Sequence, residues 1–384
     1  MNDVIAIVQN RMGKTRLPGK FFLYLANKPM LVRDIERIRS PKKTLLIRVD
    51  ANLDIGAGHV MRCLAIAQVW QDDGGIVTFL MAPGSPSLEQ RICSEGMNVL
   101  TITERPGSDE DATITVEIAK KIESSWIVVD GYQFGATYQK ILKTHNFKVF
   151  FIDDYGHADH YYADIVLNQN IYANMSFYKN YEQYTRFLLG SNFVLLRREF
   201  LNMARYNRKI PEVARKVLIT FGGADPDNIT LNIIEALKKI EIDALELIAV
   251  VGGVNPNYET LKQNVEGHPS FLIRKNVENM PELMAWADVA ISAGGSTCWE
   301  LAFSGLPNII IILSDDQELI AAELSKQGVS ITLGRFGNTN NTSIINVISE
   351  LILSPKKRYT MSQTGRRIVD GNGAHRVISA LKDN

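Results

Sequence analysis

The chain has 384 residues, more than one ordinary hydrophobic core accommodates, so its length suits two domains. About 46% of the residues are hydrophobic and 22% are charged, as in an ordinary globular protein. Basic and acidic residues balance at 42 each, so no global basic field attracts nucleic acid or an acidic membrane. The three cysteines are isolated, and no apolar stretch resembles a signal peptide or a membrane span. We therefore expect a cytoplasmic protein without a disulfide framework, a zinc site or a transmembrane helix.

Strand, turn and helix patterns alternate along most of the chain, which predicts parallel sheets. The predicted strands, in chain order, are residues 4–8, 44–49, 76–81, 126–129, 149–152, 216–220, 247–251, 289–292 and 308–313. Amphipathic helical stretches lie between most of them, for example at 59–71 and 228–239. This alternation predicts two α/β domains.

The predicted divisions of the chain are 1–41, 42–195, 196–215 and 216–384. The second and fourth of these are the α/β domains, and the third is a charged connector. The last domain is expected to end in a helix at 374–382. The first division holds one βα unit, a strand at 4–8 and a helix at 30–39, which cannot bury a core alone.

A glycine-rich turn after the strand at 44–49 is the strongest candidate site. Gly56, Gly58 and His59 stand where this strand gives way to a helix. Glycine lets the backbone come close to a ligand, and a helix N-terminus offers free N–H groups to an anion. The same helix end favours the neutral imidazole that a general base needs, with Asp50 or Asp54 to orient it. The alternative is a structural turn with a solvated histidine.

A second glycine turn follows the strand at 216–220. Gly222, Gly223 and Asp225 precede a helix for which Asp227 or Asn228 is a suitable N-cap. A diphosphate could rest on the amides of the two glycines. The alternative is a βα turn that serves only the fold.

A third region follows the strand at 289–292. Its candidate binding residues are Gly294, Gly295, Ser296, Thr297, Glu300 and Gln317. The glycines would admit a phosphate, and a carboxylate two turns into the helix can accept both ribose hydroxyls of a nucleotide. By itself, Glu300 also fits an ordinary surface position of a helix.

A fourth region lies at the ends of two neighbouring apolar strands. Asp130 and Tyr132 follow one strand, and Asp153 and Asp154 follow the next. Ligands of open parallel sheets bind beyond the carboxyl ends of strands, so Tyr132 is placed to hydrogen-bond a reacting sugar. Two adjacent acids without histidine are weak metal ligands, so we expect neither a metal nor another cofactor. Arg62, at the first glycine turn, is either a ligand-binding or an ion-paired arginine.

Together these regions resemble a family of UDP-sugar hydrolases, which release 2,4-diacetamido-2,4,6-trideoxy-L-altrose from UDP in the biosynthesis of pseudaminic acid, a nonulosonic acid. The matching segments, over about residues 43–380, are RVDANLDIGAGHVMRCLAIA, VVDGYQF, FIDD, ADIVLNQN, LLGSNFVLLRREF, TFGGADPDNIT, ISAGGSTCWELAFSGLP and VDGNGAHRV. The third region is also similar to the UDP-binding half of the MurG-type glycosyltransferases. The resemblance implies a GT-B fold, in which two Rossmann-like domains face each other across a cleft.

The resemblance also implies roles for individual residues. The family's general-base histidine falls on His59, its strand-end tyrosine on Tyr132, and the ribose-binding glutamate on Glu300. The implied reaction is metal-independent hydrolysis at the anomeric carbon with inversion, in which Tyr132 and Asp130 position sugar or water. Two alternatives remain: a GT-B glycosyltransferase that moves the sugar to an acceptor, and a non-catalytic protein that binds nucleotide sugars.

Residues 1–41 resemble a different family. The segment IVQNRMGKTRLPGK at 7–20 looks like the nucleotide-binding opening of the sugar-activating cytidylyltransferases. The rest of that domain, with its metal-binding acids and sugar site, has no counterpart here. We therefore interpret residues 1–40 as a remnant or as a segment that docks other enzymes of the sugar pathway.

Overall fold

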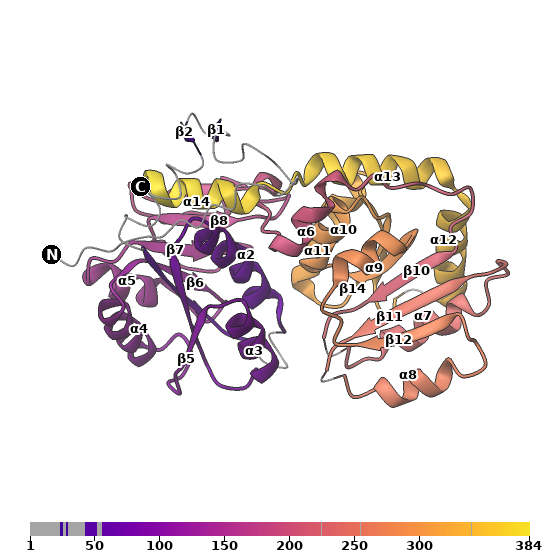
Figure 1. Cartoon of the computed structure of the whole chain (residues 1–384), viewed down its shortest axis with the longest axis horizontal. Coiled ribbons are helices and arrows are strands. Elements are labelled where there is room, and N and C mark those ends of the chain that lie inside the picture. The colour runs from indigo at the N-terminus through magenta and orange to yellow at the C-terminus, as the bar shows by residue number, and fades with distance from the viewer. Residues whose placement is uncertain are drawn as a thin grey trace, which may run out of the picture.

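In the computed structural model, two α/β domains lie side by side (Figure 1). The structure describes residues 24–25, 28–29, 43–51, 56–223, 225–253, 255–338 and 340–384. The strand predicted at 4–8 and the helix predicted at 30–39 lie outside the described residues. Strands β1 (Tyr24–Leu25) and β2 (Lys28–Pro29) pair with each other in a separate antiparallel sheet.

The first domain is built on a seven-stranded parallel sheet in the order β5-β4-β3-β6-β7-β8-β9. Its strands are β3 (Thr44–Val49), β4 (Ile76–Met81), β5 (Asn98–Thr101), β6 (Ser124–Asp130), β7 (Val149–Ile152), β8 (Ile165–Asn168) and β9 (Arg186–Leu189). Its helices are α2 (Gly58–Asp72), α3 (Pro86–Ser94), α4 (Asp109–Lys121) and α5 (Ala136–Thr144), with short 3₁₀ turns η2 (Met175–Phe177) and η3 (Ser191–Phe193).

Helices cover both faces of this sheet. Successive side chains of a strand point to opposite faces. Leu45 and Ile47 of β3 accordingly pack with α2, whereas Leu46 packs with α4 and α5. A strand that is buried on both faces is mostly apolar, as in the run TLLIRV, and its one buried charge, Arg48, is paired with Asp50 and Asp111.

The second domain repeats this plan on a six-stranded parallel sheet in the order β12-β11-β10-β13-β14-β15. Its strands are β10 (Lys216–Thr220), β11 (Glu246–Val251), β12 (Phe271–Lys275), β13 (Val289–Ala293), β14 (Asn308–Ile312) and β15 (Ser330–Arg335). Its helices are α7 (Ile229–Leu237), α8 (Tyr258–Asn264), α9 (Met280–Trp286), α10 (Thr297–Phe303), α11 (Glu318–Lys326), α12 (Asn341–Leu353) and α13 (Pro355–Ile368), with the turn η5 (Asp315–Gln317).

Two segments join the domains. The connector after the first domain contains α6 (Arg198–Leu201) and the turn η4 (Asn202–Arg205). The last helix, α14 (Gly373–Asp383), crosses back and lies over the first domain (Figure 1). Its Val377 and Leu381 pack in the same core as α2, and Lys382 pairs with Asp73 at 2.6 Å. The sequence placed residues 216–384 in the second domain, but α14 packs in the core of the first domain. The difference arises because an amphipathic pattern shows that one face of a helix is buried but does not show which core buries it.

Both sheets reverse their winding direction at one point. In the first sheet, β3 leads to β4 on one side and β6 leads to β7 on the other, so a crevice opens between the ends of β3 and β6. In the second sheet, β10 and β13 form the corresponding crevice. Ligands of such sheets bind at these points, which directs attention to the four loops that follow these strands.

Candidate functional site

A cavity of about 630 Å³ lies between the two domains and is lined by loops from both. The predicted residues that line it are Gly56, Gly58, His59, Arg62, Tyr132, Gly222, Gly223, Asp225, Gly294, Gly295, Ser296, Thr297, Glu300 and Gln317. A Cβ added at Gly58 would lie 3.6 Å from the Oγ of Ser296, so the starts of α2 and α10 approach each other across the cleft. Asp130, the remaining predicted residue, is fully buried and contacts His59.

The contact between His59 and Asp130 orients the imidazole ring. Nδ1 of His59 lies 2.6 Å from Oδ1 of Asp130, close enough for Nδ1–H to donate to the carboxylate. Nη2 of Arg62 also lies 3.2 Å from Nδ1, but the shorter contact to Asp130 favours the tautomer with the proton on Nδ1, which leaves a lone pair on Nε2. Nε2 carries no hydrogen bond to any of the described residues, and the ring lines the cavity. This arrangement meets the geometric requirement for a general base.

Arg62 holds the carboxylate in turn. Its Nε and Nη2 each donate to Asp130 at 2.7 Å, one to each carboxylate oxygen. Burial alone would raise the pKa of Asp130, but the charges of Arg62 and His59 outweigh burial and hold the pKa well below its usual value. Asp130 is therefore an anion throughout the neutral range, as a group that stabilises an imidazolium must be.

The same arginine also binds the carboxylate after the next strand. Nη1 of Arg62 donates to both oxygens of Asp154, at 2.8 and 3.0 Å. Asp154 also accepts from the Tyr132 hydroxyl at 2.9 Å and from Nδ2 of Asn170 at 3.0 Å. Burial, reinforced by the charge of Asp154, raises the pKa of Tyr132 far above its usual range, so its hydroxyl stays protonated. The Tyr132 ring stands edge-on to the His59 ring, with centroids 5.1 Å apart.

Asp50 does not orient the histidine, contrary to one of the two options from the sequence. Its carboxylate binds Arg48, Gln133 and the backbone N–H of Ala82. Arg48 is itself fully buried and pairs with Asp111, so this second network supports the sheet and does not reach the cavity. Asp54 lies outside the described residues.

The second domain contributes glycine-rich loops to the cavity. Gly222 has a φ of +84°, which favours glycine, and the N–H of Gly252 donates to the carbonyl of Gly223 at 3.1 Å. Oε1 of Gln317 accepts from the N–H groups of Gly294 and Leu313, which ties the loops after β13 and β14 together. These loops place the N-terminus of α10 at the cavity.

Asp225 is engaged in the fold. Its carboxylate accepts from the N–H groups of Ile229 and Thr230 and from the Thr230 hydroxyl. It therefore caps α7, whereas the sequence pattern predicted Asp227 or Asn228 for this role. Asn228 stands at the N-cap position but makes no capping hydrogen bond with its side chain. Asp225 lines the cavity, yet both of its oxygens are already used.

Glu300 lies one turn into α10 and faces the connector. Nη2 of Arg197 donates to its Oε1 at 2.8 Å. Burial raises the pKa of Glu300, and the charge of Arg197 opposes this shift. Arg197 and Arg62 are the cations among the described cavity-lining residues, and both are already paired with carboxylates. A bound diphosphate would therefore depend on backbone amides and helix N-termini.

Several cavity residues were missed as binding residues in the sequence. They are Asn170, Tyr172, Arg197 and Asp316, and Asp154 was noted only as a weak metal ligand. Asn170 lies two residues after the end of β8, as Asp154 does after β7, so the rule that ligands bind beyond the carboxyl ends of strands points to both. Arg197 approaches the cavity from the connector, which carries no such signal.

Within the described ranges, no group of three or more histidine, cysteine, aspartate or glutamate side chains is placed to hold a metal ion. In the same part of the chain, no helix is both long enough and apolar enough to cross a membrane.

Two parallel-sheet domains that face each other across a ligand-sized cleft define the GT-B fold, as the sequence predicted. The crystal structure of MurG from Acinetobacter baumannii aligns with 90% of this chain and 100% of its own, with a TM-score of 0.61 and 16% identity. This identity is low, so the likeness establishes the fold alone. The family model for the glycosyltransferase family 28 C-terminal domain matches residues 217–373, and the cytidylyltransferase model matches residues 5–50.

Two curated relatives match this chain over nearly their whole length. The spore coat polysaccharide biosynthesis protein SpsG of Bacillus subtilis is 25% identical over 339 residues, which are 88% of this chain and 97% of SpsG. The UDP-2,4-diacetamido-2,4,6-trideoxy-beta-L-altropyranose hydrolase of Campylobacter jejuni is 26% identical over 289 residues. That match covers 75% of this chain and 98% of the hydrolase. The chain is thus similar to proteins of nucleotide-sugar and polysaccharide metabolism in both of its domains.

Proposed function

We propose that this protein hydrolyses a UDP-linked diacetamido-trideoxy sugar at the anomeric carbon, in pseudaminic (nonulosonic) acid biosynthesis. The observation that carries the proposal is the contact between His59 and Asp130. The His59 ring lines the interdomain cavity, and its Nε2 has no hydrogen-bond partner among the described residues. The similarity to the Campylobacter jejuni hydrolase supports the choice of substrate class.

In the proposed reaction, Nε2 of His59 takes a proton from water while the water oxygen attacks C1 of the sugar. The bond between C1 and the diphosphate oxygen breaks, and its electron pair leaves with UDP from the opposite face. The configuration at C1 therefore inverts. The imidazolium that forms is stabilised by Asp130, which is already an anion. Tyr132 keeps a lone pair that can accept from the sugar while its proton is held by Asp154.

The second domain would hold UDP. Glu300 is the proposed acceptor for the ribose hydroxyls, and the loops at Gly222–Gly223 and Gly294–Gly295 are the proposed cradle for the diphosphate. The cations that line the cavity are already neutralised, which supports stabilisation of the leaving group by fixed dipoles of the backbone.

A second candidate is a glycosyltransferase. It is favoured by the family 28 match to the second domain. The same histidine would then deprotonate an acceptor hydroxyl in place of water. The first domain would have to admit that acceptor.

A panel of UDP-sugars, incubated with the purified protein and EDTA and followed by NMR, tests the proposal. We expect UDP and an inverted free sugar without any acceptor. Release that requires an added acceptor would establish the transferase, and tight UDP binding without turnover on any sugar would indicate a binding protein.

A further inference from the structure

We infer that Arg197 is a positioning residue for nucleotide recognition, which holds the Glu300 carboxylate in place for the ribose hydroxyls and connects it to the first domain. The inference rests on the proposed role of Glu300 as the ribose acceptor. It assigns a function to an interdomain arginine to which the sequence motifs gave no role.

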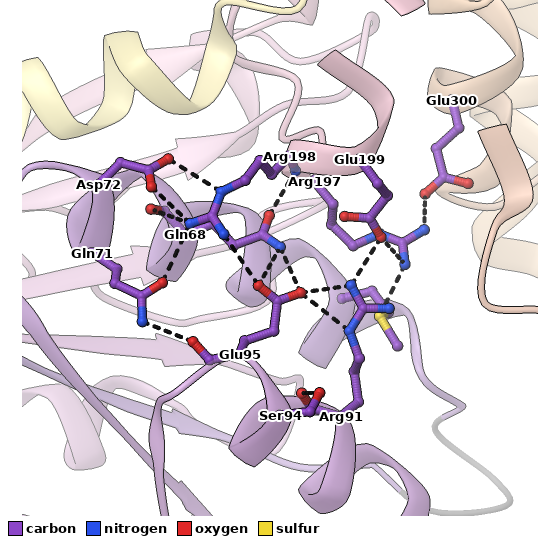
Figure 2. Close-up of polar contacts among 11 residues, drawn as sticks. Gln68, Gln71, Asp72, Arg91, Ser94, Glu95, Arg197, Arg198, Glu199 and Glu300 are labelled. Atoms are coloured by element: carbon purple, nitrogen blue, oxygen red, sulfur yellow. Dashed lines mark hydrogen bonds and ion pairs between the residues drawn. The ribbon is translucent and has the colours of Figure 1, made fainter. Parts of the chain in front are cut away.

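The guanidinium of Arg197 reaches both sides of the cleft, as Figure 2 shows. Its Nη2 donates to Oε1 of Glu300 at 2.8 Å. Its Nη1 lies 3.1 Å from Glu199 and 3.5 Å from the sulfur of Met61, a residue of α2. The side chain is about nine-tenths buried, and its Nε has no partner among the described residues. The two glutamates hold the guanidinium, and the Phe200 ring, whose centroid lies 5.1 Å from its central carbon, packs against it.

The arrangement leaves Glu300 able to bind a ligand. An ionised carboxylate has about four acceptor sites on its two oxygens. Arg197 uses one of them, which leaves enough for the two hydroxyls of a ribose. The charged groups that act on Glu300 are Arg197 and Glu199 of the connector, and Cys298 is the titratable neighbour on its own helix. Burial raises the pKa of Glu300, and Arg197 opposes that shift, so the arginine also favours the ionised acceptor.

A chain of ion pairs anchors Arg197 to the first domain (Figure 2). Glu199 pairs with Arg91 of α3 at 3.1 Å, and Arg91 pairs with Glu95 at 2.7 Å. Glu95 then accepts from Gln68 of α2 at 3.0 Å. Because α2 also carries His59, the proposed ribose acceptor and the proposed base are held in one connected network.

The neighbouring arginine provides a matched control. Arg198 stands on the same connector and pairs with Asp72 at 2.8 Å and with Glu95 at 3.4 Å. It does not line the cavity, and its contacts are with the first domain. Replacing Arg198 disturbs the connector without touching Glu300.

The test compares the affinities of UDP and 2′,3′-dideoxy-UDP by calorimetry for the full chain and four variants. The wild type should prefer UDP, because the second ligand lacks both ribose hydroxyls. Glu300→Gln and Arg197→Met should each lower this preference by roughly tenfold, the weight of one well-placed charged hydrogen bond. Arg197→Lys should retain part of the preference for UDP, because lysine keeps the charge but lacks the planar guanidinium that can donate to two carboxylates at once. Arg198→Met should retain all of it, with a lower Tm.

The outcomes separate this inference from the proposed function. If Glu300→Gln keeps the full preference, the ribose role itself is wrong. Two results would overturn the inference, provided that Glu300→Gln loses the preference. In the first, Arg197→Met keeps the preference for UDP. In the second, Arg197→Met lowers the affinities for both ligands by the same factor, which means that Arg197 has a structural role only. Should Arg197→Met fail to fold, Arg197→Lys decides: a reduced preference supports the inference, and an unchanged preference contradicts it.

Discussion

The two domains line the cleft with different kinds of residue. The first domain presents charged side chains that bind one another, with His59, Asp130, Arg62 and Asp154 in one network. The second domain presents glycine loops and the start of α10, and the charged residues that it adds to the described lining are carboxylates, Asp225, Glu300 and Asp316, without a cation. A proton that moves during the reaction needs a side chain to receive it, whereas a diphosphate of fixed charge can be held by peptide dipoles.

Different substitutions should therefore impair the two sides of the cleft. On the first domain's side, we expect loss of function when a side chain that takes part in the network is removed. On the second domain's side, we expect loss of function when a side chain is added at a glycine, because binding there depends on space that a Cβ would occupy. The following variants test this contrast in order of expected effect.

Removal of the proposed base should have the largest effect. His59→Ala should lower kcat on the order of 10²–10⁴-fold, because general-base catalysis contributes about that much. KM and the affinity for UDP should not change, because the second domain is intact. Steady-state kinetics and calorimetry measure the two quantities. His160→Ala, a change at a histidine that pairs with Glu182 outside the cavity, is the control. A near-wild-type kcat in His59→Ala would remove the histidine from the mechanism.

Removal of the charge behind the base should come next. Asp130→Asn should lower kcat by up to about 10⁴-fold, because an amide no longer dictates which imidazole nitrogen carries the proton. Asp111→Asn is the matched control, since it also neutralises a buried carboxylate paired with an arginine, Arg48, away from the cavity. Both variants should lower Tm, measured by thermal unfolding, because each leaves a buried arginine short of a partner. Equal losses of kcat in the two variants would mean that Asp130 acts only through stability.

Addition of a methyl group should damage the opposite wall. A Cβ at Gly252 would lie 2.3 Å from the carbonyl oxygen of Gly223, so Gly252→Ala must displace the proposed diphosphate loop. We expect UDP affinity, measured by calorimetry, to fall about tenfold, the loss of roughly one good hydrogen bond. Gly135→Ala adds the same methyl group in open space at the start of α5 and should bind UDP normally. Normal UDP binding by Gly252→Ala would argue against a backbone cradle at this loop.

The strands that cross the middle of each sheet were the most predictable part of the fold. β3, β4, β7 and β10 begin and end at the predicted residues, because buried strands are short, mostly apolar runs. The edge strands β5 and β12 were missed, because their residues are largely exposed and polar side chains dilute the apolar signal. β8 was missed as well, although its four residues are buried.

The sequence identified the groups at the site better than their partners. Each glycine turn was visible locally, and the sequence offered Asp50 or Asp54 as the partner of His59. The actual partner is Asp130, and this contact depends on which strands are neighbours. His59 and Asp130 are 71 residues apart, and a crossover that places β6 beside β3 brings them together. The contact between Arg197 and Glu300 depends on how two domains pack, which no local pattern records.

A last and smaller effect should appear in the pH dependence of UDP binding. Burial raises the pKa of Glu300, and Arg197 opposes the shift while Glu199 adds to it. A carboxylate with a raised pKa is ionised at high pH and loses its charge as the pH falls through that pKa. The preference of the wild type for UDP over 2′,3′-dideoxy-UDP should therefore fall as the pH is lowered from neutral, and this fall should begin above the pH range in which an ordinary carboxylate titrates. Both ligands carry the same diphosphate, so its own titration cancels in their ratio. A preference that stays constant as the pH falls would show that ribose recognition does not depend on the ionised carboxylate of Glu300. It would contradict the proposed role of Glu300 as the ribose acceptor.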